Sequence, residues 1–343
     1  MTNHYYFKGV YAMQRKVTIK DIAELAKTSK TTVSFYLNGR FDKMSEETKN
    51  RISESIKATN YKPSIAARSL NAKSTKLIGV VIGDITNSFS NQIVKGIESK
   101  AQEFGYQIII GNSNYDPSRE DELIEKMLNL GVDGFIIQPT SNFRKYSRII
   151  DIKKKKVVFF DSQLYEHRTN WVKTNNYDAV YDTIQQCIDK GYEHFIMITG
   201  NPNLLSTRIE RASGFIDVLE ANHLTHQEMI IDENQTSSEA IAQFLQGSLT
   251  KKSLVFVPNC WALPKVFTAM KSLKFNIPEI GLVGFDNIEW TKFSSPTLTT
   301  IIQPAYEEGE QATKILIDDI EGHSQEAKQQ IFDCQVNWQE STF

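Results

Sequence analysis

The stretch that decides the fold runs from Thr18 to Leu70, and it contains TIKDIAELAKTSKTTVSFYL over residues 18–37 and KPSIAARSL over residues 62–70. The first piece has the pattern of a short helix, a turn and a second short helix. The second piece begins with Lys62-Pro63, and a proline interrupts a helix that approaches it from the N-terminal side. A small helical unit and a separate short segment therefore precede the rest of the chain.

Capping signals define the helices of this first unit. Thr18 and Asp21 have the Ser/Thr-x-x-acid form of a capping box, which predicts a helix from Ile19 to about Ala26. Ser29 is the predicted N-cap of a second helix over residues 30–37. The residues of this second helix that we expect to face outward are Lys30, Thr31, Ser34 and Phe35. A third helix is predicted to begin at Ser45 and to end near Asn60, which completes a three-helix core.

Charge is divided unevenly along the chain. Residues 1–76 contain 15 Lys and Arg against 6 Asp and Glu, a net charge of +9. The remaining residues contain 24 Lys and Arg against 35 Asp and Glu, a net charge of −11. The basic N-terminal unit is therefore the part of the chain that suits a polyanion such as DNA.

The motifs of residues 17–79 resemble the head and hinge of the LacI/GalR family of transcriptional regulators. VTIKDIA, SKTTVS, LNG and ARSL all stand at the family's spacing. The resemblance implies a homodimer whose paired hinge helices enter the minor groove of a pseudo-palindromic double-stranded DNA operator, with Leu70 as the wedge that kinks the central base step. Residues 64–70 are too short for a stable isolated helix, so we expect this hinge helix to form only when docked.

The same resemblance assigns roles to individual positions of the head and hinge. It implies base contacts by Lys30, Thr31 and Phe35, phosphate contacts by Thr18, Thr32, Ser34 and Asn38, and minor-groove contacts by the hinge residues Ala67, Arg68 and Leu70. Phe35 departs from the arginine that is usual in the family. An arginine contact to guanine is therefore lost, and a contact to a thymine methyl group or a plain packing role takes its place.

From about residue 76 onward, short apolar runs alternate with helical stretches, which is the signature of βαβ units. The predicted strands form two sets, 77–82, 107–111, 134–138 and 157–161, and then 195–199, 229–231, 254–257 and 280–285. Predicted helices between them include 91–104 and 118–130. The fold class that we expect is an all-α helix-turn-helix head plus an α/β body with two doubly wound parallel-sheet lobes, which the resemblance identifies as the periplasmic-binding-protein type.

These features predict the domain boundaries. We expect a disordered tail over 1–16, a helix-turn-helix DNA-binding domain over 17–62 and a hinge helix with its linker over 63–76. The effector-binding and dimerisation domain spans 77–340. Its N-lobe is predicted over about 77–174 and 304–332, and its C-lobe over about 175–303 and 333–340.

Polar residues just after the strand ends are the candidates for a ligand site between the lobes, because the carboxyl ends of the strands meet there. With the resemblance, the predicted effector-binding residues are Phe89, Ser90, Asp161, Arg208, Arg211, Asn234, Asn259 and Asp286. Arg208 has the alternative of a solvated helix residue. Cys260 replaces a frequent aspartate, which together with the two arginines favours an acidic ligand, a sugar acid or a phosphosugar. The chain is similar in this respect to repressors of 2-keto-3-deoxygluconate utilisation in Gram-positive bacteria.

Other classes of protein fit less well. An enzyme is not expected, because the chain lacks the common nucleotide-binding, zinc-protease and serine-hydrolase motifs. A solute-binding protein for a transporter is disfavoured by the basic head and by the lack of a signal-peptide pattern. No cofactor, metal or membrane span is expected, and three scattered cysteines indicate a reducing, cytoplasmic setting. A phosphocarrier protein as coregulator stays open beside direct ligand control, and residues 153–156, four lysines, are interpreted as a solvated helix end.

Overall fold

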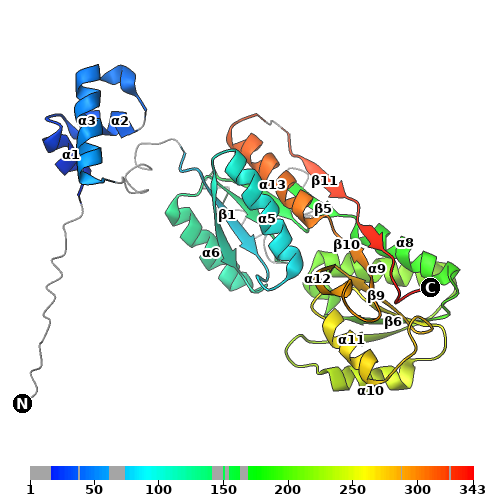
Figure 1. The fold of residues 1–343 in the computed structure, drawn as a ribbon. Coiled ribbons are helices and arrows are strands. Elements are labelled where there is room, and N and C mark those ends of the chain that lie inside the picture. The colour runs from blue at the N-terminus through cyan, green and yellow to red at the C-terminus, as the bar shows by residue number, and fades with distance from the viewer. Residues whose placement is uncertain are drawn as a thin grey trace, which may run out of the picture. The chain divides into compact units, whose positions relative to one another are not determined.

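The computed structural model describes residues 17–37, 39–61, 74–140, 150, 154–162, 169–286, 288–323 and 326–343. The predicted tail and most of the predicted hinge lie outside these ranges. The chain divides into two compact units, residues 1–75 and residues 76–343 (Figure 1). Within the described residues, no helix is both long and apolar enough to cross a membrane.

The first unit, the head, is a three-helix bundle. It contains α1 (Ile19–Leu25), α2 (Lys30–Leu37), the 3-10 turn η1 (Phe41–Lys43) and α3 (Glu46–Thr59). Ile22, Val33 and Ile52 are fully buried between the helices. The predicted caps are confirmed: Thr18 and Asp21 form both bonds of a capping box, and the Thr32 amide donates to Ser29 Oγ at 3.0 Å. The first helix ends one residue earlier than predicted, since Ala26 is its C-cap.

The second unit, the body, alternates strands and helices along the chain. Its first part contains β1 (Leu77–Ile82), α5 (Ser88–Glu103), β2 (Gln107–Asn112), α6 (Pro117–Leu130), β3 (Gly134–Ile137), β4 (Lys156–Phe160) and β5 (Asn170–Thr174). The middle contains α8 (Asn176–Asp189), β6 (His194–Thr199), η2 (Pro202–Leu204), α9 (Ser206–Ala221), β7 (His226–Ile230), α10 (Ser238–Ser248), β8 (Ser253–Val257), α11 (Leu263–Ser272), β9 (Gly281–Phe285), α12 (Ile288–Thr291) and β10 (Thr299–Ile302). The last part contains α13 (Ala305–Ile320), β11 (Gln329–Phe332) and β12 (Gln335–Asn337).

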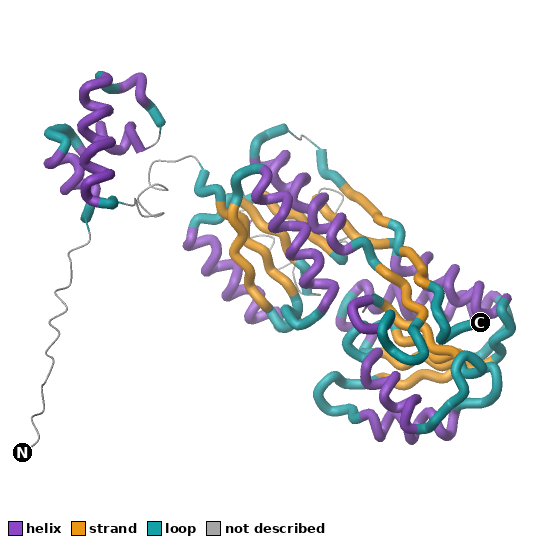
Figure 2. Tube along the Cα trace, in the orientation of Figure 1, coloured by secondary structure: helices purple, strands orange, loops and turns teal. Residues whose placement is uncertain are grey.

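These strands form two six-stranded sheets, which Figure 2 shows as two separate groups of strands. The first sheet has the order β11-β5-β4-β3-β1-β2 and the second has the order β12-β10-β9-β8-β6-β7. Within the described residues, all strand pairings are parallel except the antiparallel pairing of β10 with β12. The predicted fold class, with two doubly wound parallel-sheet lobes, is confirmed.

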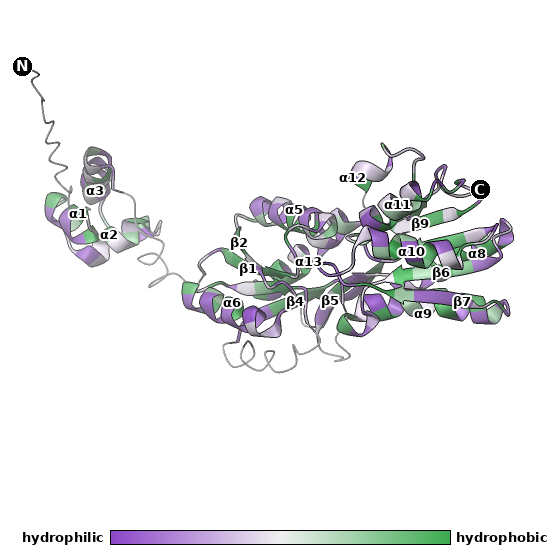
Figure 3. Ribbon diagram, turned by 90° about the horizontal axis from the view of Figure 1, so that it is seen from below, coloured by the Kyte–Doolittle hydropathy of each residue, from purple (hydrophilic) through white to green (hydrophobic). Residues whose placement is uncertain are grey.

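Helices cover both faces of the first sheet. Ile78, Val80 and Ile82 of β1 pack with apolar residues of α5 and α13 on one face, while Val81 packs with α6 on the other. This division follows from the alternation of side chains along a strand. The central strands β1 and β3 are apolar on both faces because both are buried. Helices α5 and α6, which cover the sheet, carry both hydrophilic and hydrophobic residues (Figure 3). We call this sheet with its helices lobe 1.

The second sheet is covered in the same way and forms lobe 2. Helices α8 and α9 pack on one face and α10 and α11 pack on the other. Three segments cross between the lobes: β5 leads into α8, β10 leads into α13, and β11 leads into β12. The carboxyl ends of the central strands therefore meet near these crossovers, where the candidate site lies.

Several predicted boundaries shift in the structure. The helix predicted from residue 91 begins at Ser88, because the Asn87 side chain accepts the Phe89 amide and caps it. The strand predicted over 229–231 spans His226–Ile230. The strands β5, β10, β11 and β12 were not predicted, since each has only three to five residues and little apolar periodicity. The helix predicted over 118–130 begins one residue earlier, at Pro117, with Asp116 as its N-cap.

Candidate functional site

The head exposes the start of its second helix. Lys30 and Thr31 are exposed on α2, while Ser34 and Phe35 are half-buried. The guanidinium of Arg40 lies 5.3 Å from the centre of the Phe35 ring, so a cation now borders the position at which the family usually carries its own arginine. The described part of the head therefore presents a polar and cationic helix end to solvent.

The remaining predicted DNA contacts divide into two groups. Thr18 and Thr32 lie at the N-terminal ends of α1 and α2, where their side chains take part in capping bonds. Asn38, Ala67, Arg68 and Leu70 lie outside the described residues.

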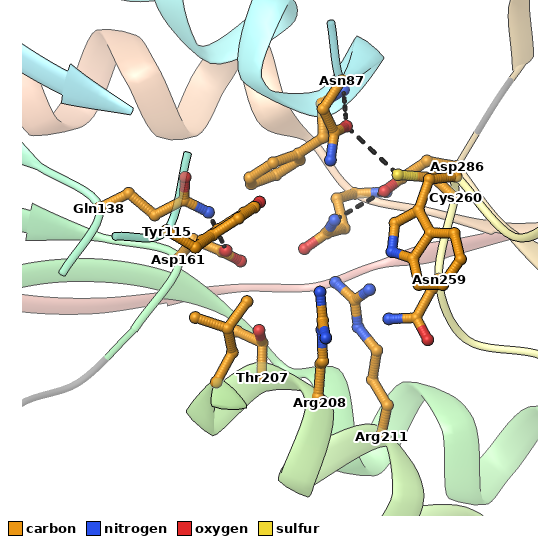
Figure 4. A pocket seen from close by; sticks show the side chains of 14 residues that line it. Asn87, Tyr115, Gln138, Asp161, Thr207, Arg208, Arg211, Asn259, Cys260 and Asp286 are labelled. Atoms are coloured by element: carbon orange, nitrogen blue, oxygen red, sulfur yellow. Dashed lines mark hydrogen bonds between the residues drawn. The ribbon is translucent and has the colours of Figure 1, made fainter. Parts of the chain in front are cut away.

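A cavity lies between the lobes of the body, with a volume of about 40 Å³ (Figure 4). That volume admits a few water molecules and is well below the roughly 300 Å³ at which ligand pockets ordinarily begin. A sugar therefore enters only if the lobes separate or side chains move. The lining residues are Asn87, Phe89, Tyr115, Gln138, Asp161, Leu205, Thr207, Arg208, Arg211, Asn259, Cys260, Trp261, Asp286 and Gln303.

Lobe 2 contributes a carboxylate with a full set of partners. Asp286 follows β9 and has a positive φ of 54°. Its Oδ1 accepts the Gln303 backbone amide at 3.0 Å, and its Oδ2 accepts Gln303 Nε2 at 2.8 Å. Burial raises the pKa of Asp286, while the nearby charge of Arg211 opposes that shift. Asp286 is thus held from both oxygens within its own lobe.

Arg211 lies on α9, and hydrogen bonds hold its guanidinium in place. Its Nε donates to Asn176 Oδ1 at 2.7 Å and its Nη1 donates to the carbonyl of Pro258 at 2.8 Å. The guanidinium also lies 3.6 Å from the centre of the Phe285 ring. These contacts position a buried cation between the two pocket carboxyl groups.

Lobe 1 contributes a similar carboxyl group that has fewer hydrogen-bond partners. Asp161 follows β4 with a φ of 59°, and its Oδ2 accepts Gln138 Nε2 at 2.7 Å. Its Oδ1 is buried and has no hydrogen-bond partner within the described residues. Burial raises the pKa of Asp161 to about 6, against the opposing effect of Arg211. This oxygen is available to a hydroxyl donor that enters the cavity.

A second buried carboxyl group stands behind Asp161. Glu308 of α13 is fully buried, and its Oε1 accepts the Asp161 backbone amide at 2.9 Å. Burial, reinforced by the charge of Asp161, raises the pKa of Glu308 well above its usual value. The hydrogen bond from the Asp161 amide to Glu308 fixes the Asp161 backbone.

Arg208 stands beside Arg211 on α9 and points into the same space (Figure 4). Among the described residues its one hydrogen bond is a long one, from Nη1 to the Asn201 carbonyl at 3.4 Å. Desolvation lowers the pKa of Arg208, and the described residues offer it no ion pair. Arg208 is half-buried and lines the cavity, so it is not a fully solvated helix residue.

Contacts across the cavity join the two lobes. Cys260 of lobe 2 donates its thiol hydrogen to Asn87 Oδ1 of lobe 1 at 3.2 Å. Lys173 of β5 forms a largely buried ion pair with Glu210 of α9 at 2.6 Å. The lobes thus touch through polar contacts on more than one side of the cavity.

The structure brings six of the eight predicted effector residues together at the cavity: Phe89, Asp161, Arg208, Arg211, Asn259 and Asp286. Ser90 is buried but does not line the cavity, and Asn234 is exposed in a turn where its amide donates to Asp232. Sequence reasoning missed Gln138 and Gln303. Gln138 is the last residue of the predicted strand 134–138, and the strand-end signal would have found it. Gln303 follows β10, a strand that the sequence analysis did not predict. Tyr115 was missed as well, and it lies over Gly83, where an added Cβ would come within 2.1 Å of the ring.

Comparison with known proteins places the whole chain. A profile described as "Bacterial regulatory proteins, lacI family" matches residues 18–64, and one described as "Periplasmic binding protein domain" matches residues 78–324. The HTH-type transcriptional regulator KdgR of Bacillus subtilis is 32% identical over 311 residues, covering 89% of this chain and 91% of KdgR. The probable HTH-type transcriptional regulator EndR of Paenibacillus polymyxa is 30% identical, covering 90% of this chain and 92% of EndR.

A solved structure supports the fold over the same length. The lac repressor dimer bound to operator and the anti-inducer ONPF matches with a TM-score of 0.80 at 20% identity, covering 96% of this chain and 99% of that one. This likeness shows the fold, while the two profiles and the relatives at 30% identity or more show the class of protein. The chain belongs to the LacI family of bacterial regulatory proteins and is a DNA-binding transcriptional regulator.

Proposed function

We propose that this chain is a dimeric, cytoplasmic repressor of a sugar-acid catabolic operon, in which an effector bound between the lobes sets the affinity for operator DNA. The single observation that carries the effector class is Arg208, a guanidinium that lines the cavity without an ion pair among the described residues. Arg208 is half-buried. A partly desolvated cation without a counter-ion loses free energy, so a ligand that supplies a negative charge gains affinity.

The cavity favours one negative charge on a polyhydroxy ligand. Arginine binds a carboxylate through two parallel hydrogen bonds, and Arg208 has donors free for such a pair. The unpartnered Oδ1 of Asp161 accepts a hydroxyl group. A phosphate dianion would stand near both Asp161 and Asp286 with only one uncommitted guanidinium, which disfavours a phosphosugar. A sugar acid such as 2-keto-3-deoxygluconate has the required groups.

Calorimetric titration tests the effector class. The probes are 2-keto-3-deoxygluconate, gluconate, 6-phosphogluconate and neutral glucose, each added to the full-length protein. We expect the monoanions to bind more tightly than glucose, and Arg208→Met to weaken them by roughly tenfold or more, as for the loss of a charge-assisted pair. Equal binding of glucose, with no effect of Arg208→Met, would contradict the proposal. Tighter binding of 6-phosphogluconate would replace the sugar acid with a phosphosugar.

The DNA half of the proposal rests on the family and on the basic head. Two heads in a dimer predict a pseudo-palindromic site, because operator symmetry mirrors protein symmetry. Selection from a random DNA library with the purified protein yields that site. We expect Leu70→Ala to weaken operator binding strongly while the titration with the sugar acid stays unchanged. An unchanged operator affinity would show that Leu70 is not a groove wedge.

A further inference from the structure

Three consecutive residues, Thr174, Asn175 and Asn176, occupy the first crossover between the lobes. Thr174 is the last residue of β5 in lobe 1, and it is fully buried. Its hydroxyl donates to Gln303 Oε1 at 2.8 Å, and Gln303 lies at the start of the second crossover. The same Gln303 side chain donates to Asp286 of the cavity. One hydroxyl group therefore connects a strand end of lobe 1 with the pocket carboxylate of lobe 2.

Asn175 connects the same segment to the third crossover. Its backbone amide donates to the Phe332 carbonyl at 2.9 Å, and its Nδ2 donates to Asp333 Oδ1 at 3.0 Å. Its Oδ1 accepts the Cys334 amide at 2.8 Å. All three crossovers are thus hydrogen-bonded through two neighbouring side chains.

Asn176 connects the crossover segment to Arg211, which lines the cavity. Its Oδ1 accepts Arg211 Nε at 2.7 Å, and its Nδ2 makes a long hydrogen bond of 3.4 Å to the Thr174 carbonyl. The contacts form a circuit from Arg211 through Asn176, Thr174 and Gln303 to Asp286, which the electrostatic attraction between Arg211 and Asp286 closes. Arg211 and Asp286, two of the charged groups that lobe 2 presents to the cavity, are therefore held by the crossover segment.

We propose that Thr174 is a positioning residue that couples the occupancy of the effector cavity to the angle between the lobes. This inference rests on the proposed effector function and adds to it the route of the coupling. Thr174 touches neither the cavity nor DNA, yet its hydroxyl spans the segment about which the lobes turn. Buried polar groups keep their partners or lose free energy, so the circuit favours discrete arrangements of the crossovers. An effector that pulls on Asp286 and Arg211 shifts the balance between those arrangements.

The variant Thr174→Val removes the hydroxyl and keeps the shape of the side chain. Thr174→Ser restores the hydroxyl and is the rescue variant. Thr183→Val is the matched control, because Thr183 is equally buried but its hydroxyl bonds only within α8, to the Ala179 carbonyl at 2.6 Å. If Thr174→Val does not fold, Thr174→Cys replaces it, since a thiol keeps the volume and is only a weak donor.

The first measurement is the change in operator affinity that saturating 2-keto-3-deoxygluconate produces. Couplings of this kind span about 5- to 150-fold. We expect Thr174→Val to reduce that change by about fivefold or more, while operator affinity without ligand stays within about twofold. Thr174→Ser and Thr183→Val should retain the wild-type coupling. A merely structural role for Thr174 would lower stability in both valine variants and leave the coupling ratio unchanged, and this result would overturn the proposal.

The second measurement needs no effector and separates the two proposals. Hydrogen exchange of the free full-length protein is followed at the peptide that contains Gln303, whose amide donates to Asp286. We expect exchange there to become about fivefold faster in Thr174→Val and to be unchanged in Thr183→Val. If the wild type binds no sugar acid, the proposed effector class fails and this exchange result alone decides the circuit. Unchanged exchange in Thr174→Val would refute the circuit even if the sugar acid binds.

Discussion

The two lobes present matching halves of one cavity, and they differ in how completely each half is satisfied. In each lobe an aspartate follows a buried strand with a positive φ, and a glutamine that follows a neighbouring strand donates to its Oδ2. Asp286 has a partner for both oxygens and Arg211 in its own lobe. Asp161 leaves one buried oxygen unpaired and takes its nearest cation from the opposite lobe.

This difference assigns separate tasks to the lobes. Lobe 2 holds Asp286 through hydrogen bonds and the nearby charge of Arg211, and leaves Arg208 without an ion pair among the described residues. Lobe 1 gathers carboxyl groups whose pKa burial raises, Glu120, Asp161 and Glu308, and none of them has a cation of lobe 1 as a partner among the described residues. We infer that an effector supplies the anion that Arg208 of lobe 2 lacks and the hydrogen-bond donor that Asp161 of lobe 1 lacks.

The largest expected effect on stability comes from removing Arg211, the cation beside Asp286. Arg211→Met leaves Asp286 and Asp161 without their shared positive neighbour and strips the donor from Asn176 and from the Pro258 carbonyl. Breaking a buried charge pair from one side costs about 3–5 kcal/mol. Urea unfolding at pH 7 should show a loss of stability of that order.

Arg208→Met is the matched control for that variant. Arg208 lies on the same helix and lines the same cavity, but its one hydrogen bond among the described residues is the long contact to Asn201. We expect the stability of Arg208→Met to stay within about 1 kcal/mol of that of the wild type. Equal losses of stability in both variants would mean that the positive charge of Arg211 has no special role beside Asp286 and Asp161.

The second effect probes the buried carboxyl groups of lobe 1 through pH. Burial raises the pKa of Glu120 to about 7. Because the pKa in the folded state lies above that in the unfolded state, the contribution to stability is present below about pH 4.5 and is lost as the pH rises through about 7. Glu120→Gln should therefore flatten stability against pH from 5 to 8 and stabilise the protein at pH 8 by about 1–3 kcal/mol.

The control for Glu120 lies on the same helix. Glu122 is exposed, and its pairing with Lys126 lowers its pKa. Glu122→Gln should leave the stability of the protein unchanged within error at each of these pH values. Thermal unfolding from pH 5 to 8 compares the two variants. A Glu120→Gln protein with the wild-type pH profile would mean that Glu120 is ionised at no cost in its buried site.

The third effect compares the two aspartates directly. In Asp286→Asn, one side-chain atom becomes a donor that faces a Gln303 donor, so we expect a loss of about 1–3 kcal/mol. In Asp161→Asn, the new amide can occupy the position of the unpaired Oδ1, so the loss should stay below about 1 kcal/mol. Urea unfolding of both variants measures the difference. A larger loss for Asp161→Asn would reverse the assignment of the satisfied and unsatisfied halves.

Local patterns in the sequence predicted much of this architecture. The capping box at Thr18, the cap at Ser29 and the apolar run of β1 depend on neighbouring residues, and the structure confirms each of them. Asp161 and Asp286 follow buried apolar strands, so their place at the strand ends could be predicted too. These features depend on short-range periodicity and capping.

Other parts of the site depend on contacts between distant segments, which no local pattern reveals. The role of Thr174 arises from Gln303, which lies 129 residues away. Tyr115 reaches the cavity through a turn in which Asn114 and Tyr115 both have positive φ, an arrangement that ordinary propensities do not predict. Glu308 would be expected on a solvated helix face, yet it packs under Asp161.

The smallest expected effect concerns the contact that joins the halves. Cys260 lies in lobe 2 and donates to Asn87 of lobe 1, and burial raises the pKa of Cys260 to about 12, so the thiol stays protonated and remains a donor at neutral pH. Cys260→Ala removes that weak donor, and stability should fall by less than about 1 kcal/mol.

Because the hydrogen bond between Cys260 and Asn87 spans the lobes, its loss should favour the opening of the lobes more than global unfolding. We therefore expect faster hydrogen exchange near Asn87 and an unchanged urea midpoint, whereas Cys260→Ser, which retains a donor, should match the wild type in both measurements. Unchanged exchange in Cys260→Ala would mean that the lobes are held together by other contacts, such as the ion pair of Lys173 with Glu210.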